Sequence, residues 1–383
     1  MTSRERNGFL PYGISDTHLH LVYPRRIEDT LALFRNFIEY FEYDSVTLCA
    51  LTRSGHRPFD PVNNLKALYC KSVLNAERPG SVYVYGSTLH MHDEWDTAEG
   101  YLCQVRTLAE MGVDGYKLLD GKPGRRKAIG RPLSDPIFDP MYAFIEAAGL
   151  PLKMHLADPA KYWGDKSLLS DYAIMRGWYY GDGTFPSLDD LRREAREILE
   201  KFPKLKLCLA HFGYMADSYE YVCELFERFP YLSFDLTPGA SMFLEFNRRR
   251  EEWMDFFRRY GDRIFFGTDT YNNASPTDAP GNYERELHNL VRRMLERSAS
   301  EPYEHPDLGT LYPLGLPEDL LKRIYTENQR ALLGDPRPLC REAILREALR
   351  VRATLLSGEY RMPSEEELSL ELMNLDVIIR HFA

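Results

Sequence analysis

Two histidines one residue apart stand at the end of an apolar run, in the segment Asp16-Thr17-His18-Leu19-His20. In a β-strand, residues i and i+2 project from the same face, so His18 and His20 point the same way and Asp16 lies below them. Two imidazoles on one wall can hold a divalent metal ion, and two strand histidines can equally be held by hydrogen bonds alone. Further potential ligands on other strands would favour the metal site over histidines held by hydrogen bonds alone.

Further histidines and a carboxylate follow later apolar runs of the same kind. His155, His211 and Asp269 each stand at the end of such a run. If these runs are parallel strands of a barrel, their carboxyl ends meet at one face, where catalytic residues gather. Only ten histidines occur in the chain, and four of them would then lie at that face with Asp269. The sequence therefore predicts a metal site built from several strands.

Eight short β-rich runs alternate with amphipathic helical segments and would position these side chains. The predicted strands are 14–20, 45–51, 81–88, 112–119, 152–156, 205–211, 232–236 and 263–267. Alternation of this kind predicts a parallel sheet with crossover helices, and eight units most simply close into an α/β protein of the (β/α)8 TIM-barrel type. No Gly-x-Gly-x-x-Gly follows any of the runs, so a dinucleotide-binding fold has no support.

Two segments depart from the repeat. Residues 158–187 form a long loop after the fifth predicted strand, and its aromatic content favours a packed lid over the site, with an aromatic flap at a subunit contact as the alternative. Residues 335–383 carry two amphipathic helices, the second beginning at the capping box Ser364-x-x-Glu367. We expect a barrel over 1–334 and a C-terminal helical extension that packs on the barrel or on the partner subunit of a homodimer.

Composition excludes several classes of protein. The 383 residues are 44% hydrophobic and carry a net charge of −10, which argues against nucleic acid or an anionic membrane as the main partner. No stretch approaches 18 apolar residues, and the first ten residues lack an apolar signal segment, so we expect a soluble, cytoplasmic protein. The six cysteines lie far apart and form no Cys-x-x-Cys pair, which predicts free thiols.

The strand-end motifs resemble those of the amidohydrolase superfamily, and within it the amidohydrolase-related branch of metal-dependent hydrolases with a TIM-barrel fold, which includes non-oxidative decarboxylases. The resemblance spans roughly residues 14–334. It rests on Asp16-x-His18-x-His20, on His155 before Ala-Asp-Pro, on Ala-His211-Phe-Gly, on Phe-Gly-Thr-Asp269 and on the closing Asn328-x-x-Arg-x-Leu-Leu-Gly334. These motifs are specific for the family and say nothing about the substrate.

The resemblance implies a ligand set and catalytic roles. His18, His20, His155 and Asp269 would bind one divalent metal ion, most commonly zinc, with a coordination position left open for water. A bound water is acidified toward neutrality and becomes a nucleophile. Asp269 would both contact the metal and take the proton of the water, while His211 would polarise the reacting carbonyl, hold the water or act as a further ligand.

The number of metal ions depends on Lys117, near the end of the fourth predicted strand. Binuclear members of the family use a carboxylated lysine from that strand as a bridge, so the resemblance leaves a second ion open. The alternatives are that Lys117 contacts a substrate anion, or that it pairs with Asp120 or another carboxylate.

Two further charged residues are expected beneath the metal. Strand alternation places Asp16 on the face of His18 and Lys153 on the face of His155, so both should point into the barrel. Because isolated buried charges are costly, we predict that Asp16 and Lys153 pair with each other or join a polar network that steadies the ligands.

The leading functional hypothesis is a metal-dependent hydrolase that cleaves a C–N or C–O bond of a small organic substrate. A non-oxidative decarboxylase is the alternative and a hydratase a weaker one. A carboxylated substrate would need a basic side chain near the mouth, for which the candidates are Arg25, Arg26 and Arg53, with His90 and His92 nearby. The hypothesis without catalysis is an inactive barrel that serves as a binding protein.

Overall fold

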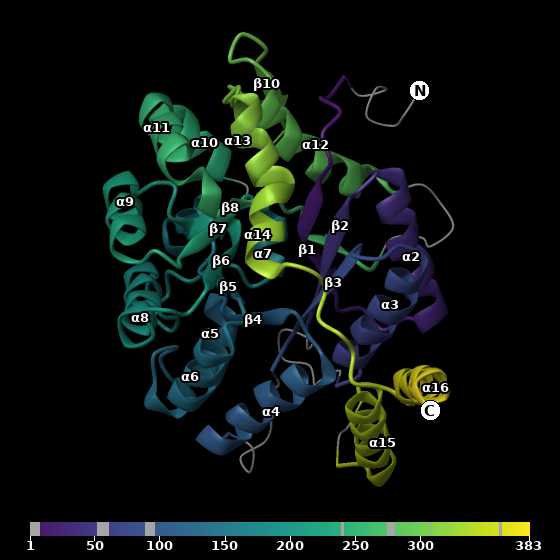
Figure 1. Cartoon of the computed structure of the whole chain (residues 1–383). Helices are drawn as coiled ribbons and strands as arrows, with labels where there is room; N and C mark the ends of the chain where they lie inside the picture. Colours follow the sequence, from purple (N-terminus) through teal and green to yellow (C-terminus); the bar gives the residue numbers. More distant parts are fainter. Residues whose placement is uncertain are drawn as a thin grey trace.

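The main sheet is a curled parallel sheet of nine strands that alternate with helices (Figure 1). The computed structural model describes residues 8–51, 61–88, 96–238, 241–273, 280–306, 308–359 and 362–383. The first eight strands are β1 (Ser15–Leu21), β2 (Ser45–Ala50), β3 (Val82–Gly86), β4 (Gly115–Gly121), β5 (Leu152–Leu156), β6 (Leu207–Leu209), β7 (Ser233–Asp235) and β8 (Ile264–Phe265). Each overlaps a run that the sequence predicts as a strand, and the predicted TIM barrel is confirmed.

The barrel closes because the chain after β8 changes its partner. Phe265 pairs with Asp235 of β7, whereas the next residue, Phe266, accepts a hydrogen bond from the amide of Thr17 in β1 (3.1 Å). The ninth strand, β9 (Thr270–Tyr271), then pairs with β1 in parallel. Asp269 lies in this crossing, and its N–H donates to the carbonyl of His18 (3.0 Å). Closure therefore sets Asp269 beside the histidines of β1.

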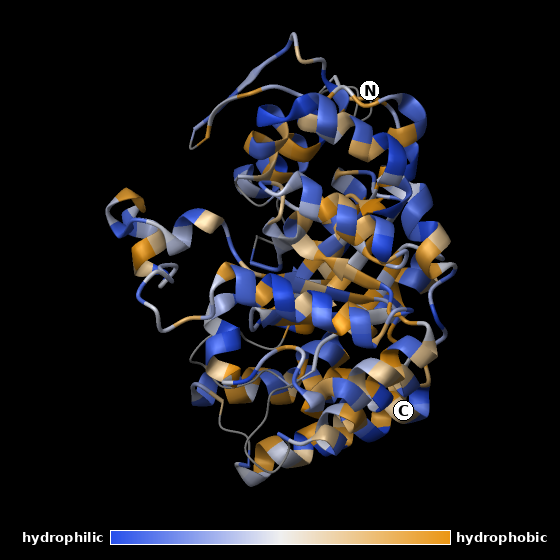
Figure 2. Cartoon of the chain, turned by 90° about the vertical axis from the view of Figure 1, so that its left-hand side faces the viewer, coloured by the Kyte–Doolittle hydropathy of each residue, from blue (hydrophilic) through white to orange (hydrophobic). Residues whose placement is uncertain are grey.

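Helices surround the sheet, and the strands inside show hydrophobic colours in Figure 2. The helices of the barrel are α2 (Ile27–Tyr40), α3 (Asn63–Glu77), α4 (Ala98–Met111), α5 (Pro123–Ile129), α6 (Asp139–Ala148), α8 (Leu188–Lys201), α9 (Tyr219–Arg228), α10 (Met242–Arg248), α11 (Arg250–Tyr260), α12 (Asn282–Glu296), α13 (Glu318–Lys322) and α14 (Asn328–Leu333). An antiparallel hairpin of β10 (Tyr303–His305) and β11 (Gly309–Leu311) follows α12. Helix α8 shows how these elements form, since the Ser187 capping box begins it and an apolar stripe including Leu191 and Ile198 is buried.

The segment after β5 contains short helices where the sequence predicts a loop. These are η2 (Ala160–Trp163), η3 (Lys166–Leu168) and α7 (Asp171–Met175). The base of the segment is packed, because Tyr180 is buried against the rings of Trp163 and Phe185. Its outer part is exposed, with Leu168 at 82% and Met175 at 74% of full exposure.

Two helices follow the barrel, α15 (Arg341–Ser357) and α16 (Glu365–Phe382). Glu371 of α16 accepts a hydrogen bond from the buried ammonium of Lys66 in α3 (2.8 Å). Asn374 accepts from the amide of Ile27 at the start of α2 (2.9 Å), so α16 supplies the cap that α2 lacks locally. None of the described helices is both long and apolar enough to cross a membrane.

Candidate active site

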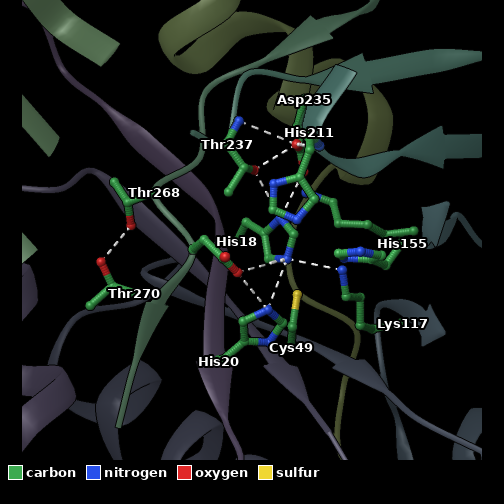
Figure 3. Close-up of polar contacts among 12 residues, drawn as sticks. His18, His20, Cys49, Lys117, His155, His211, Asp235, Thr237, Thr268 and Thr270 are labelled. Atoms are coloured by element: carbon green, nitrogen blue, oxygen red, sulfur yellow. Dashed lines mark hydrogen bonds and ion pairs between the residues drawn. The ribbon is translucent and has the colours of Figure 1, made fainter. Parts of the chain in front are cut away.

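His18, His20 and Asp269 converge where β1 meets β9, and Figure 3 shows the two histidines beside each other. The Nε2 atoms of His18 and His20 are 3.1 Å apart. Asp269 Oδ1 lies 2.9 Å from Nε2 of His20 and 3.8 Å from Nε2 of His18. Both imidazoles are buried, while the side chain of Asp269 is 20% exposed. Three of the four ligands implied by the family resemblance thus form one cluster.

The protonation states suit metal binding. Burial lowers the pKa of His18, and the charge of Lys117 lowers it further, so that the pKa lies well below the ordinary value. Burial likewise lowers the pKa of His20. Burial opposes ionisation of Asp269, but the hydrogen bond with His20 and the nearby imidazoles outweigh it and hold the pKa of this carboxyl far below its usual range. The cluster therefore combines neutral imidazoles with a carboxylate.

His18 is oriented by Asp235, at the end of β7. Nδ1 of His18 lies 2.8 Å from Oδ2 of Asp235 and 2.9 Å from Oγ1 of Thr237 (Figure 3). The pKa of Asp235 is well below its ordinary value, because Lys153 and His18 outweigh the effect of burial. An ionised carboxylate only accepts hydrogen bonds, so Nδ1 of the neutral ring carries the proton. Nε2 then presents a lone pair to the cluster.

Two buried lysines stand opposite each other, Lys117 on β4 and Lys153 on β5. Nζ of Lys117 lies 2.9 Å from Nε2 of His18, and its pKa is lowered, first by burial. Nζ of Lys153 donates to Oδ2 of Asp235 and to the carbonyl of Thr17, both at 2.8 Å. The ion pair raises the pKa of Lys153 despite its burial. Lys117 thus contacts the imidazole of His18, and it does not form the ion pair with Asp120 that was one of the predicted alternatives.

Asp16 joins a different part of the polar network. Its Oδ2 accepts a hydrogen bond from Thr268 (2.6 Å), and its Oδ1 accepts from the amide of His18 (3.0 Å). Burial raises the pKa of Asp16 to about 6. Lys153 pairs with Asp235 rather than with Asp16. The predicted ion pair between Asp16 and Lys153 is therefore not observed, and the two residues join a polar network instead. Both residues contact the strand that carries His18.

The structure turns His155 toward a neighbouring carboxylate. Its Nε2 lies 3.4 Å from Oδ1 of Asp158, which also accepts from Lys122 (2.8 Å) and, through Oδ2, from Tyr180 (2.6 Å). Burial lowers the pKa of His155 to about 3. Its ring centroid is 4.8 Å from that of His211. His155 thus lies beside the cluster without belonging to it, and its role as a ligand stays a prediction.

His211 lies on a backbone turn in the left-handed region. His211, Phe212, Gly213 and Tyr214 all have positive φ, between 50° and 61°. The amide of His211 donates to Oδ1 of Asp235 (2.8 Å), and the Tyr214 ring stacks on its imidazole. The ring of Phe212 is buried in an aromatic cluster that anchors the turn. Nδ1 of His211 is buried without a hydrogen-bond partner among the described residues.

Backbone strain gathers at this end of the barrel. Besides the turn at His211, Ala157 (φ 62°) and Asp269 (φ 60°) adopt left-handed conformations, and both follow strands. Left-handed conformations of residues other than glycine cost free energy and persist where the surrounding structure enforces them, most often at functional sites.

The basic residues expected near the mouth do not all fall in the described part of the chain. Arg25 donates to the carbonyl of Asn273 (3.3 Å), and Arg26 lies near Glu28. Arg53, His90 and His92 lie outside the described residues.

Asp235 is the site residue that the sequence analysis missed. It lies one residue before the end of the seventh predicted strand and is the last residue of β7, so the rule that selected the other polar strand ends could have selected it. Thr237, two residues later, donates to Oδ1 of Asp235 (2.5 Å). The strand-end position alone marks Asp235 as a candidate, whereas its support of His18 depends on a residue 217 positions away in the sequence.

A divalent metal ion fits the cluster. Two neutral imidazoles and a carboxylate are donors that zinc and other first-row divalent ions accept. Nε2 of His18 is directed by the Asp235 contact to present a lone pair, and Nε2 of His20 and Oδ1 of Asp269 face it. A carboxylate behind a ligating histidine is a common second contact in metal sites.

Comparison with known proteins places the chain in a family. The sequence model of an amidohydrolase family matches residues 91–334. The chain therefore belongs to this amidohydrolase family, in agreement with the resemblance of its motifs. No curated protein matches the chain.

Solved structures of similar fold include several enzymes. The 2,6-dihydroxybenzoate decarboxylase from Rhizobium has 14% identity and a TM-score of 0.48, with 84% of this chain and 98% of that chain covered. A dihydroxybenzoic acid decarboxylase from Polaromonas, with bound manganese and 2-nitroresorcinol, has 14% identity and a TM-score of 0.46, with 84% and 96% covered. The 4-oxalomesaconate hydratase from Rhodopseudomonas palustris has 13% identity and a TM-score of 0.45, with 90% and 99% covered.

Proposed function

We propose that the protein is a metal-dependent enzyme that removes a carboxyl group from a small carboxylated substrate without an oxidant. The observation that carries this proposal is the position of Lys117. Its buried Nζ faces the His18, His20 and Asp269 cluster at 2.9 Å from His18, and no described carboxylate lies within ion-pair distance of it. An ammonium so placed beside a metal ion needs an anion between the two charges, and a substrate carboxylate supplies one.

His18, His20 and Asp269 would hold the ion, with His155 as a further ligand if its imidazole turns away from Asp158. The mixed nitrogen and oxygen donor set suits zinc, our first choice, and also manganese or iron. When bound, the ion supplies a positive charge that stabilises negative charge on the substrate. A second ion would require carboxylation of Lys117.

The side chains around the cluster would then bind the substrate and move the proton. Lys117 holds the carboxylate and fixes which C–C bond faces the site. That bond breaks, its electron pair stays on the substrate carbon, and carbon dioxide leaves. His211 is the candidate donor of the proton that the carbon takes up, because an anionic substrate beside its imidazole favours the protonated form.

Hydrolysis of a C–N or C–O bond is the second candidate. It is supported by Asp269, whose carboxylate is ionised, partly exposed and 2.9 Å from His20. A carboxylate beside the ion could take a proton from water and pass it to the leaving group.

Product analysis separates the two reactions. The protein loaded with zinc or manganese is incubated with a panel of aromatic and aliphatic carboxylates, and with amides and lactones of the same acids. Release of carbon dioxide from the acids supports decarboxylation, whereas incorporation of ¹⁸O from labelled water into a carboxyl product supports hydrolysis. A protein that binds no divalent ion after metal-supplemented expression would contradict both, and would favour an inactive barrel that only binds a ligand.

A further inference from the structure

We infer that Asp235 is a positioning residue that prepares two different parts of the active site at once. One carboxylate oxygen fixes the ring of His18 in the form that presents Nε2 to a metal ion, and the other holds the backbone of His211. The inference rests on the metal site proposed above and does not depend on which reaction the site performs.

The contacts of Asp235 divide between its two oxygens. Oδ2 lies 2.8 Å from Nδ1 of His18 and 2.8 Å from Nζ of Lys153. Oδ1 accepts from the amide of His211 (2.8 Å) and from the hydroxyl of Thr237 (2.5 Å). Asp235 is fully buried, so water does not replace any of these partners.

All these partners donate to Asp235, and this makes a carboxylate necessary. An ammonium and a backbone amide can only donate, and the hydroxyl of Thr237 points at Oδ1. An asparagine would have to place its NH₂ group against one of the two sets of donors. If the NH₂ faces His18, Nδ1 must become the acceptor, and the proton moves to Nε2, where a metal ion cannot bind. If it faces His211, the amide of the strained turn loses its acceptor.

The second contact explains how the turn at His211 is held. Its backbone has φ 56° and the following residue φ 55°, so the local chain does not favour this shape by itself. The aromatic packing of Phe212 holds one side of the turn, and the bond to Asp235 fixes the amide of His211. Asp235 thus links the orientation of His211 to the protonation pattern of His18.

The first test uses the unaltered, metal-free protein and nuclear magnetic resonance of ¹⁵N-labelled histidines, with His18 assigned by the loss of its signals in His18→Gln. We expect the proton of His18 on Nδ1 and a bare Nε2 at neutral pH. A proton on Nε2 would overturn the inference, whatever the activity of the enzyme.

The second test compares Asp235→Asn with Asp114→Asn. Asp114 is a matched control, because it is also buried and pairs with a buried lysine, Lys71, at 2.7 Å. We expect Asp235→Asn to weaken binding of Zn²⁺ by about 10- to 100-fold and to populate the Nε2 proton of His18 in the metal-free protein. Asp114→Asn should change neither measurement.

The outcomes separate this inference from the proposed function. If both variants bind Zn²⁺ as tightly as the wild-type protein, the positioning role of Asp235 is wrong while the metal site stands. If the wild-type protein binds no divalent ion, the proposed function fails, and the tautomer of His18 still decides the role of Asp235. Should Asp235→Asn not fold, the wild-type resonance measurement alone supports or overturns the inference.

Discussion

Two buried lysines in neighbouring strands should respond in opposite ways to the same substitution. Lys153 forms an ion pair with Asp235 at 2.8 Å, whereas Lys117 contacts a neutral imidazole, and burial lowers its pKa. Lys153→Met leaves the buried carboxylate of Asp235 without its charged partner. Lys117→Met removes a buried charge that the folded protein disfavours, and methionine fills similar space. We therefore expect the first substitution to destabilise the metal-free protein and the second to stabilise it.

The magnitude follows from the contacts. Breaking a buried ion pair by removing one partner costs about 3–5 kcal/mol. With an unfolding entropy of about 2.1 cal/mol/K per residue over the 383 residues, this corresponds to a fall in Tm of about 4–6 °C for Lys153→Met. We expect Lys117→Met to raise Tm.

The same variants should differ in anion binding. A hydrogen bond to a charged group contributes about 1.5–3 kcal/mol, so Lys117→Met should weaken binding of acetate to the cobalt-loaded protein by about 10- to 160-fold. Calorimetry of the metal-free proteins and the visible spectrum of bound cobalt provide the two measurements. A fall in Tm for Lys117→Met as large as that for Lys153→Met would refute the reasoning, because it would mean that Lys117 has a charged partner.

Three further outcomes are expected. For the hydrolytic candidate, Asp269→Asn should lower kcat by about 10²–10⁴-fold with an unchanged far-ultraviolet circular dichroism spectrum, and full hydrolytic activity of this variant would exclude Asp269 as the catalytic base. Removal of metal with a chelator should abolish activity, and adding back an ion at 100 times its Kd should stabilise the fold by about 2.7 kcal/mol, seen as a concentration-dependent Tm. Lys66→Met removes the buried ammonium with which α3 pairs with Glu371 of α16, so we expect faster proteolysis within the tail after residue 334; tail cleavage at the wild-type rate would argue against docking of α16 through this pair.

Much of the architecture followed from local sequence patterns. The eight strand runs, the helices between them and the polar residues at the strand ends could all be recognised, because alternation of apolar residues and turn signals is a local property. The amidohydrolase motifs were recognisable for the same reason. The closure of the sheet through β9 was not recognisable, because Thr270 and Tyr271 pair with β1 across most of the length of the chain.

The sequence by itself determined the residue types of the site, with His18 and His20 on one strand face and Asp269 at a strand end. Tertiary structure alone decided the partners, because they come from strands far apart in the chain. Strand alternation directs Lys117 and Lys153 into the barrel, but only the closed barrel sets Asp235 against Lys153 and leaves Lys117 facing His18. It also turns His155 toward Asp158, a contact that depends on the positions of Lys122 and Tyr180. The charge of a buried side chain and the direction of a histidine lone pair depend on such neighbours in three dimensions, and the linear sequence pattern does not specify these neighbours.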